Sequence, residues 1–103
     1  MEEDFKVVDN YLMIRMPEEI DHHNSVDISQ RADRYIVSKK VGNVVFDFER
    51  TTFMDSSGVG IILGRYRKIS CFGGKVYAVN AGSRIRRLFL LSGLENIVEL
   101  IEQ

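Results

Sequence analysis

The residue types with the clearest chemical potential gather in one short segment, residues 53–60. Its notable members are, in order, Asp55, Ser56, Ser57, Gly58 and Gly60. Aspartate and serine are favoured at the start of a helix, because their side-chain oxygens accept hydrogen bonds from free N–H groups there. One cap needs one residue, whereas three capping-type residues stand together here. The two glycines each lower helix propensity by about 1 kcal/mol and leave the backbone open to another surface. The residues alone leave two interpretations open, an ordinary helix cap and a contact site.

A serine in this position is also suited to phosphorylation. The free N–H groups and the positive end of a helix dipole favour a bound phosphate. Phosphorylation adds about −1.5 to −2 charges, so a phosphorylated Ser56 beside Asp55 would give the segment about three negative charges. A partner docked over it would feel like-charge repulsion of about 3 kcal/mol per pair of unit charges at about 5 Å, for an effective dielectric constant near 20. A charge switch at Ser56 is therefore physically reasonable.

Catalytic and cofactor-binding interpretations have weaker support. The spacing of Gly58, Gly60 and Gly64 is G-x-G-x-x-x-G, whereas a dinucleotide-binding loop needs tighter spacing directly after a strand. A hydrolase triad could be drawn from Asp21, a histidine at position 22 or 23, and Ser56. Ser56 does not stand in a G-x-S-x-G elbow, and adjacent histidines seldom bind one metal ion because their side chains diverge. We therefore expect no catalytic residue, no metal and no cofactor.

The composition excludes several classes of protein. The chain has 103 residues, of which 45% are hydrophobic and 28% charged, enough to bury the core of one small domain. It has 14 basic and 15 acidic residues, which argues against a dedicated nucleic-acid-binding protein. A single cysteine excludes an internal disulfide framework. The acidic start is unlike a signal peptide, and no apolar run approaches the about 20 residues of a membrane span. We therefore expect a soluble, cytoplasmic domain.

Hydrophobic patterns predict the elements that must position the segment. The expected strands cover residues 5–8, 11–16, 44–48, 75–79 and 97–101, and the expected helices cover 26–40, a stretch after Asp55 that ends before Gly73, and 83–91. The stretches 18–23 and 49–55 are expected to be loops, with Asn24 or Ser25 capping the first helix. The second helix is expected to bury one apolar stripe: Val59, Ile62, Leu63, Tyr66 and Ile69.

The order of these elements predicts the fold class. Two strands joined at Asp9-Asn10 precede an alternation of helices and strands, which is typical of an α/β domain with a largely parallel sheet. The N-terminal hairpin adds an antiparallel edge. There is no internal repeat or linker, so residues 1–103 are expected to form a single domain.

The segment from Phe53 to Tyr66 (F-M-D-S-S-G-V-G-I-I-L-G-R-Y) resembles the anti-sigma factor antagonists, which are members of the STAS domain family. It is especially similar to the sporulation antagonists of the IIAA type in Bacillus-like bacteria. Further segments that resemble the family are Glu19–His23, Phe72–Val76, Arg87–Phe89 and Ser92–Leu94, so the similarity covers nearly the whole chain. The resemblance implies the STAS fold, a small mixed sheet of about four or five strands with helices packed mainly on one side.

The same resemblance implies a function and a set of partners. Ser56 would be phosphorylated by the cognate anti-sigma factor, which is itself a serine kinase that uses ATP, and a PP2C-type phosphatase would restore the active form. The unphosphorylated antagonist would bind the anti-sigma factor and release the sigma factor, which regulates transcription in sporulation. By carry-over, the docking surface would include Asp21, Asp55, Ser57, Gly58, Val59 and Gly60. Such a protein is not an enzyme and binds no nucleic acid directly.

Two features depart from the family pattern. Pro17-Glu18 stands where the family has a small residue before the acidic loop, and the chain ends about where the family's last helix would begin. We therefore expect that helix to be short or missing. The alternative function is a STAS module that binds a small ligand or nucleotide, or an accessory domain in stress signalling or transport. Such a module would bind its ligand saturably at the same loop.

Overall fold

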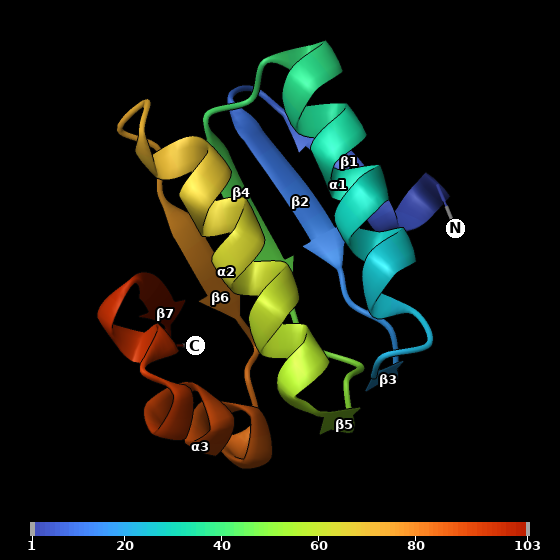
Figure 1. The fold of residues 1–103 in the computed structure, drawn as a ribbon, viewed down its shortest axis with the longest axis vertical. Coiled ribbons are helices and arrows are strands. Elements are labelled where there is room, and N and C mark those ends of the chain that lie inside the picture. Colours follow the sequence, from blue (N-terminus) through green and yellow to red (C-terminus); the bar gives the residue numbers. More distant parts are fainter. Residues whose placement is uncertain (1, 103) are drawn as a thin grey trace.

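The computed structural model describes residues 2–102, which form a five-stranded mixed sheet in the order β1-β2-β4-β6-β7. The strands are β1 (Phe5–Val8), β2 (Tyr11–Arg15), β4 (Asn43–Asp47), β6 (Val76–Val79) and β7 (Val98–Ile101). β1 pairs with β2 in antiparallel fashion, and the remaining strands run parallel to β2 (Figure 1). The predicted α/β fold with an antiparallel N-terminal edge is confirmed.

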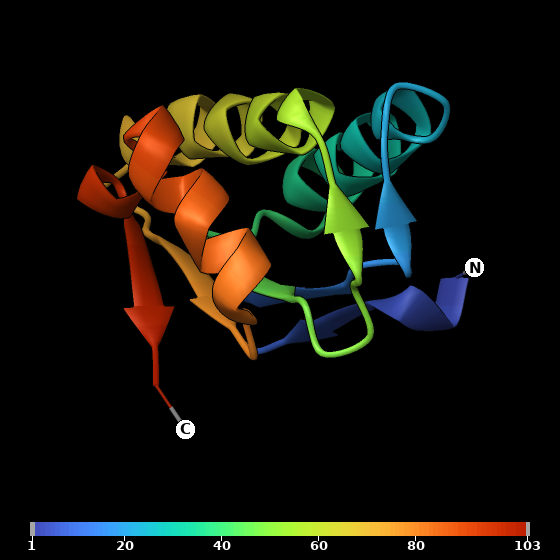
Figure 2. The same ribbon diagram turned by 90° about the horizontal axis from the view of Figure 1, so that it is seen from below.

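Three helices connect the parallel strands. They are α1 (Ser25–Lys39), α2 (Ser56–Ser70) and α3 (Ser83–Ser92), with short 3-10 turns at Glu2–Asp4 and Leu94–Asn96. After β2 the sheet grows in one direction, and right-handed crossovers then place successive helices on the same face. Figure 2 shows the helices gathered on one side of the sheet. The predicted arrangement of helices mainly on one side is confirmed.

The hydrophobic core lies between this covered face and the helices. Alternate residues of β2 and β4 point into it, so that Leu12, Ile14, Val44 and Phe46 have almost no exposed surface. Ile28, Ala32 and Ile36 of α1 and Ile61, Ile62 and Ile69 of α2 pack against them. The alternation leaves the remaining side chains of each strand on the opposite face, which no helix covers within residues 2–102.

The two stretches expected to be loops each contain a short strand. β3 (Glu19–Ile20) and β5 (Phe53–Met54) pair in parallel as a separate two-stranded sheet. The prediction of loops was wrong because a two-residue strand has no measurable periodicity, and its partner lies far away in the sequence. Ile20 and Met54 are buried, which explains why apolar residues interrupt these otherwise polar stretches.

The ends of α1 differ from the prediction in detail. Asn24 is the residue before the helix, but its side chain makes no cap hydrogen bond. Its amide instead donates to the carbonyl of Glu19 at 2.8 Å, and its side-chain oxygen accepts from the backbone N–H of Asp21 at 3.1 Å. Asn24 therefore fastens the preceding loop to the helix. At the other end the helix runs to Lys39 and its C-cap is Lys40, the last residue of the predicted helix, whose φ of 53° is left-handed.

The apolar stripe predicted for α2 was only partly right. Ile62 and Ile69 are buried, Val59 and Tyr66 pack against the core as half-buried residues, and Leu63 is half-buried. The helix instead buries Gly58, Ile61 and Arg65 alongside the two isoleucines. The shift arises because α2 packs against α1 as well as against the sheet. Arg65 is 7% exposed, and its Nε lies 2.9 Å from Oδ1 of Asp33 on α1.

Candidate functional site

The candidate site lies at the first turn of α2. Asp55 is the N-cap residue, with extended backbone angles, and its carboxylate accepts a hydrogen bond of 2.8 Å from the N–H of Ser57. Ser56 is the first residue of the helix, and its side chain is exposed. Of the three capping-type residues in this segment, Asp55 therefore forms the cap. Because one residue fulfils this role, the cap does not require the hydroxyl of Ser56.

The small β3–β5 sheet joins the site to the acidic loop. Ile20 pairs with Met54, and the N–H of Asp55 donates to the carbonyl of Ile20 at 3.1 Å. The strands are parallel, so the residues that follow them, Asp21 and Asp55, leave the sheet at the same edge. Two carboxylates far apart in the sequence thus flank the start of α2. This pairing is the feature of the fold that positions both loops.

Asp21 sits in a tightly hydrogen-bonded turn. Its carboxylate accepts a 2.8 Å hydrogen bond from the N–H of His23, and its carbonyl accepts from the N–H groups of Asn24 and Ser25 at 3.3 and 3.0 Å. The hydrogen bond from the backbone of His23 lowers the pKa of the Asp21 carboxyl below its ordinary value. The carboxylate is therefore held in its charged form. His22 and His23 are exposed, with ring centroids 4.0 Å apart.

The two glycines near the site have different structural reasons. A Cβ atom at Gly58 would lie 2.3 Å from Cγ and 2.4 Å from Sδ of Met54, and 3.3 Å from Cγ2 of Ile20. Gly58 therefore lets α2 approach the β3–β5 sheet closely. A Cβ atom at Gly60 would meet nothing within 4 Å, so this glycine faces open space. Only Gly60 keeps an exposed stretch of backbone free of a side chain.

The predicted docking residues thus fall into three groups. Ser56 and Gly60 are exposed; Asp21, Asp55, Ser57 and Val59 are half-buried; Gly58 is buried. The structure brings the loop of Asp21 and the first turn of α2 together at one edge of the small sheet. The prediction missed the supporting role of Ile20 and Met54. The available signal was their apolar character within polar stretches.

The catalytic alternatives gain no support from the geometry. Within residues 2–102, no hydrogen bond joins the hydroxyl of Ser56 to His22 or His23. The described part of the chain also contains no cluster of three or more histidine, cysteine or acidic residues able to hold a metal ion. None of its helices is long and apolar enough to cross a membrane.

Comparison with known proteins decides the family. The model of the STAS domain family matches residues 4–103. The chain belongs to the STAS domain family. It is 34% identical over 91 residues to the anti-sigma F factor antagonist of Paenibacillus polymyxa, covering 88% of this chain and 78% of that protein. It is 35% identical over 83 residues to the anti-sigma F factor antagonist of Lysinibacillus sphaericus, covering 81% and 71% respectively.

Solved structures of this STAS domain's relatives share its fold. The anti-sigma factor antagonist SpoIIAA in its unphosphorylated form superposes with a TM-score of 0.85 at 32% identity, covering 96% of this chain and 87% of that one. The Bacillus cell fate determinant SpoIIAA in its phosphorylated form superposes with a TM-score of 0.75, also at 32% identity, covering 96% and 92%. The fold of this STAS domain is thus known in relatives with and without phosphate.

Proposed function

We propose that this STAS domain is an anti-sigma factor antagonist whose binding to an anti-sigma factor is switched off by phosphorylation of Ser56. The observation that carries the proposal is the placement of Ser56, exposed at the first position of a 15-residue helix and directly after the cap Asp55. Similarity to two anti-sigma F factor antagonists, and to SpoIIAA in both phosphorylation states, supports it.

The position of Ser56 suits a modification that must not unfold the protein. A phosphate at the first turn lies at the positive end of α2, an interaction that stabilises by about 0.3–1 kcal/mol. The neighbouring carboxylate of Asp55 opposes it with a like charge, so the two effects on folding partly cancel. The effect on a docked partner has no such compensation. A phosphate of about two negative charges facing an acidic or closely packed partner surface costs several kcal/mol, on the order of 100-fold or more in affinity.

The docking surface in this proposal surrounds Ser56. Asp21 and Asp55 supply fixed negative charge at one edge of the small sheet, Ser57 and Val59 supply half-buried contacts, and Gly60 lets the partner reach the backbone. We assign Gly58 to the support of the site, because it is buried against Met54.

The same proposal defines the partners and the absence of catalysis. The anti-sigma factor is the serine kinase that phosphorylates Ser56 with ATP, and a PP2C-type phosphatase removes the phosphate. Ser56 is then a substrate, which agrees with its exposed position and with the absence of a hydrogen-bonded base among residues 2–102. A protein that controls a sigma factor acts in the cytoplasm, where transcription takes place.

The direct test is intact-mass measurement after incubation with ATP and a cognate anti-sigma kinase. With the reaction run to completion, we expect the mass of one phosphate on the wild type, one phosphate also on Ser57→Ala, and none on Ser56→Ala. Ser57 is the matched control because it is the adjacent serine, and its N–H rather than its side chain takes part in the cap. Unmodified wild type with a kinase that modifies another antagonist would contradict the proposal, as would modification of Ser56→Ala.

Binding measurements test the switch itself. We expect Ser56→Asp to bind the anti-sigma factor at least about tenfold more weakly than the wild type, because the new carboxylate adds a negative charge at the docking surface. The loss should be smaller than that caused by phosphorylation, because a carboxylate carries less charge than a phosphate. Its melting temperature should change by only a few degrees. Equal binding by Ser56→Asp and the wild type would refute the charge mechanism. Saturable binding of a nucleotide without any anti-sigma binding would favour a ligand-binding module instead.

A further inference from the structure

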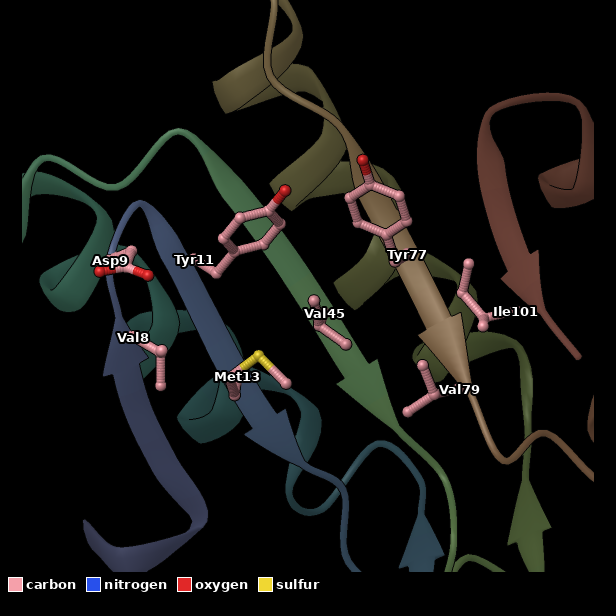
Figure 3. A pocket seen from close by; sticks show the side chains of 8 residues that line it. All are labelled: Val8, Asp9, Tyr11, Met13, Val45, Tyr77, Val79 and Ile101. Atoms are coloured by element: carbon pink, nitrogen blue, oxygen red, sulfur yellow. The ribbon is translucent and has the colours of Figure 1, made fainter. Parts of the chain in front are cut away.

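The face of the main sheet that points away from the helices carries an apolar surface. Figure 3 shows its side chains around a shallow depression of about 410 Å³, and every strand of the main sheet contributes at least one of them. The apolar residues of this outer face are Val8, Tyr11, Met13, Val45, Tyr77, Val79 and Ile101. Ser56 belongs to α2, on the opposite side of the sheet. The proposed antagonist function therefore leaves the outer face unused.

One row of side chains crosses the whole outer face. The register pairs Lys6 with Met13, Met13 with Val45, Val45 with Tyr77, and Tyr77 with Glu99. The row begins with a cation on one edge strand, passes through three apolar residues and ends with an anion on the other edge strand. Val45 is its midpoint and is only 7% exposed, because the neighbouring side chains flank it.

Such a row is complementary to its own reverse. A half-turn about an axis parallel to the strands and above Val45 places Lys6 over Glu99 of a second copy, and Glu99 over its Lys6. It also places Met13 over Tyr77 and Val45 over Val45. We propose that the outer face is the interface of a homodimer, in which two sheets pack face to face around this axis. A twofold interface needs a self-complementary surface, and this row provides one.

The charges around the row are compatible with this packing. Lys6 is exposed and forms no ion pair within the described residues, so its ammonium group is available to the second copy. Glu99 lies 3.1 Å from Lys75 of its own chain, but its side chain remains 52% exposed and can contact a second cation. Asp47, which also points to the outer face near the axis, accepts hydrogen bonds of 3.0 Å from the N–H of Glu49 and from Asn80. The half-turn places Asp47 over Asp47 of the second copy, and its exposed register partner Arg15 supplies a cation beside each of these carboxylates.

The size of the face sets the strength of the dimer. Five strands spaced by about 4.8 Å and about four residues long give a flat face of about 300 Å² per copy. Small specific interfaces bury about 600 Å² per partner, so the face alone is smaller than that of a tight dimer. We therefore expect a dimer that forms at hundreds of micromolar and leaves Ser56 accessible.

Sedimentation equilibrium of the full chain from about 10 μM to about 1 mM tests the proposal. We expect the average mass to rise from 11.8 kDa toward twice that value with increasing concentration. Lys6→Glu and Glu99→Lys should each weaken the dimer about tenfold, because each change creates two like-charge contacts per dimer. Arg84→Glu is the matched control. It makes the same change of charge as Lys6→Glu at an exposed residue of α3, and should leave the association unchanged.

Combining the variants gives the decisive result. Lys6→Glu and Glu99→Lys in one chain exchange the two charges, and this double variant should recover the wild-type association. An equimolar mixture of the two single variants should form heterodimers, because both contacts between positions 6 and 99 then join opposite charges, one as in the wild type and one with its charges exchanged. A chain that remains monomeric to about 1 mM would overturn the proposal. So would a dimer that ignores both charge reversals, since its interface would lie elsewhere.

Discussion

Substituting alanine at two neighbouring glycines of α2 should change stability in opposite directions. Alanine raises helix propensity by about 1 kcal/mol relative to glycine, and this gain applies at both positions. At Gly60 the new methyl group meets nothing within 4 Å, so Gly60→Ala should stabilise the fold by about 0.5–1 kcal/mol. At Gly58 the methyl group would lie 2.3 Å from Cγ of Met54, a buried side chain with little room to move. Overpacking of this kind costs about 1–3 kcal/mol, so we expect Gly58→Ala to destabilise by about 1 kcal/mol net.

Thermal and urea unfolding followed by circular dichroism measure the difference. The two variants should differ by about 2 kcal/mol, or roughly 10 °C in melting temperature for a chain of this length. Gly64→Ala is the control, because position 64 is also open and lies outside the candidate site. It should stabilise the protein as Gly60→Ala does. Equal stabilisation by Gly58→Ala would refute the close packing of α2 on the β3–β5 sheet.

Three further predictions test other contacts of the fold and the site. Asp55→Ala should lower the free energy of unfolding by about 1 kcal/mol, because the N–H of Ser57 loses its hydrogen-bond acceptor. Asp55→Asn keeps a side-chain acceptor and should keep most of the stability. Equal urea midpoints for the two variants would contradict the role of Asp55 as the cap. Asp33→Ala should lower the free energy of unfolding by about 2–3 kcal/mol, because it leaves the buried guanidinium of Arg65 without its carboxylate. In a double-mutant cycle, adding Arg65→Met should recover most of this loss. The Asp21 carboxyl should titrate below its ordinary pKa in an NMR experiment, because the N–H of His23 stabilises its charged form. Its contribution to stability should be present above pH 4 or so and be lost as the pH falls through the lowered pKa, a loss that Asp21→Asn should not show.

The sequence predicted most of the main sheet and its helices. Strong periodicity placed α1, α2 and α3 within a few residues of their observed ends, because each helix repeats its buried face over several turns. It also placed a capping residue among Asp55, Ser56 and Ser57, of which Asp55 forms the cap. It failed at β3 and β5, whose two-residue lengths carry no pattern. It also failed at Arg65, because a charged side chain becomes buried only when a partner such as Asp33 is brought to it.

The local sequence by itself determined that Ser56 stands at the start of a helix, because capping depends on residues adjacent in the chain. The tertiary structure alone decided that Asp21 lies beside that helix start, since the pairing of Ile20 with Met54 joins segments that no local pattern connects. It also decided which face of the sheet stays uncovered. A strand's alternation shows that it has two faces, but the path of the crossover helices determines which one is buried.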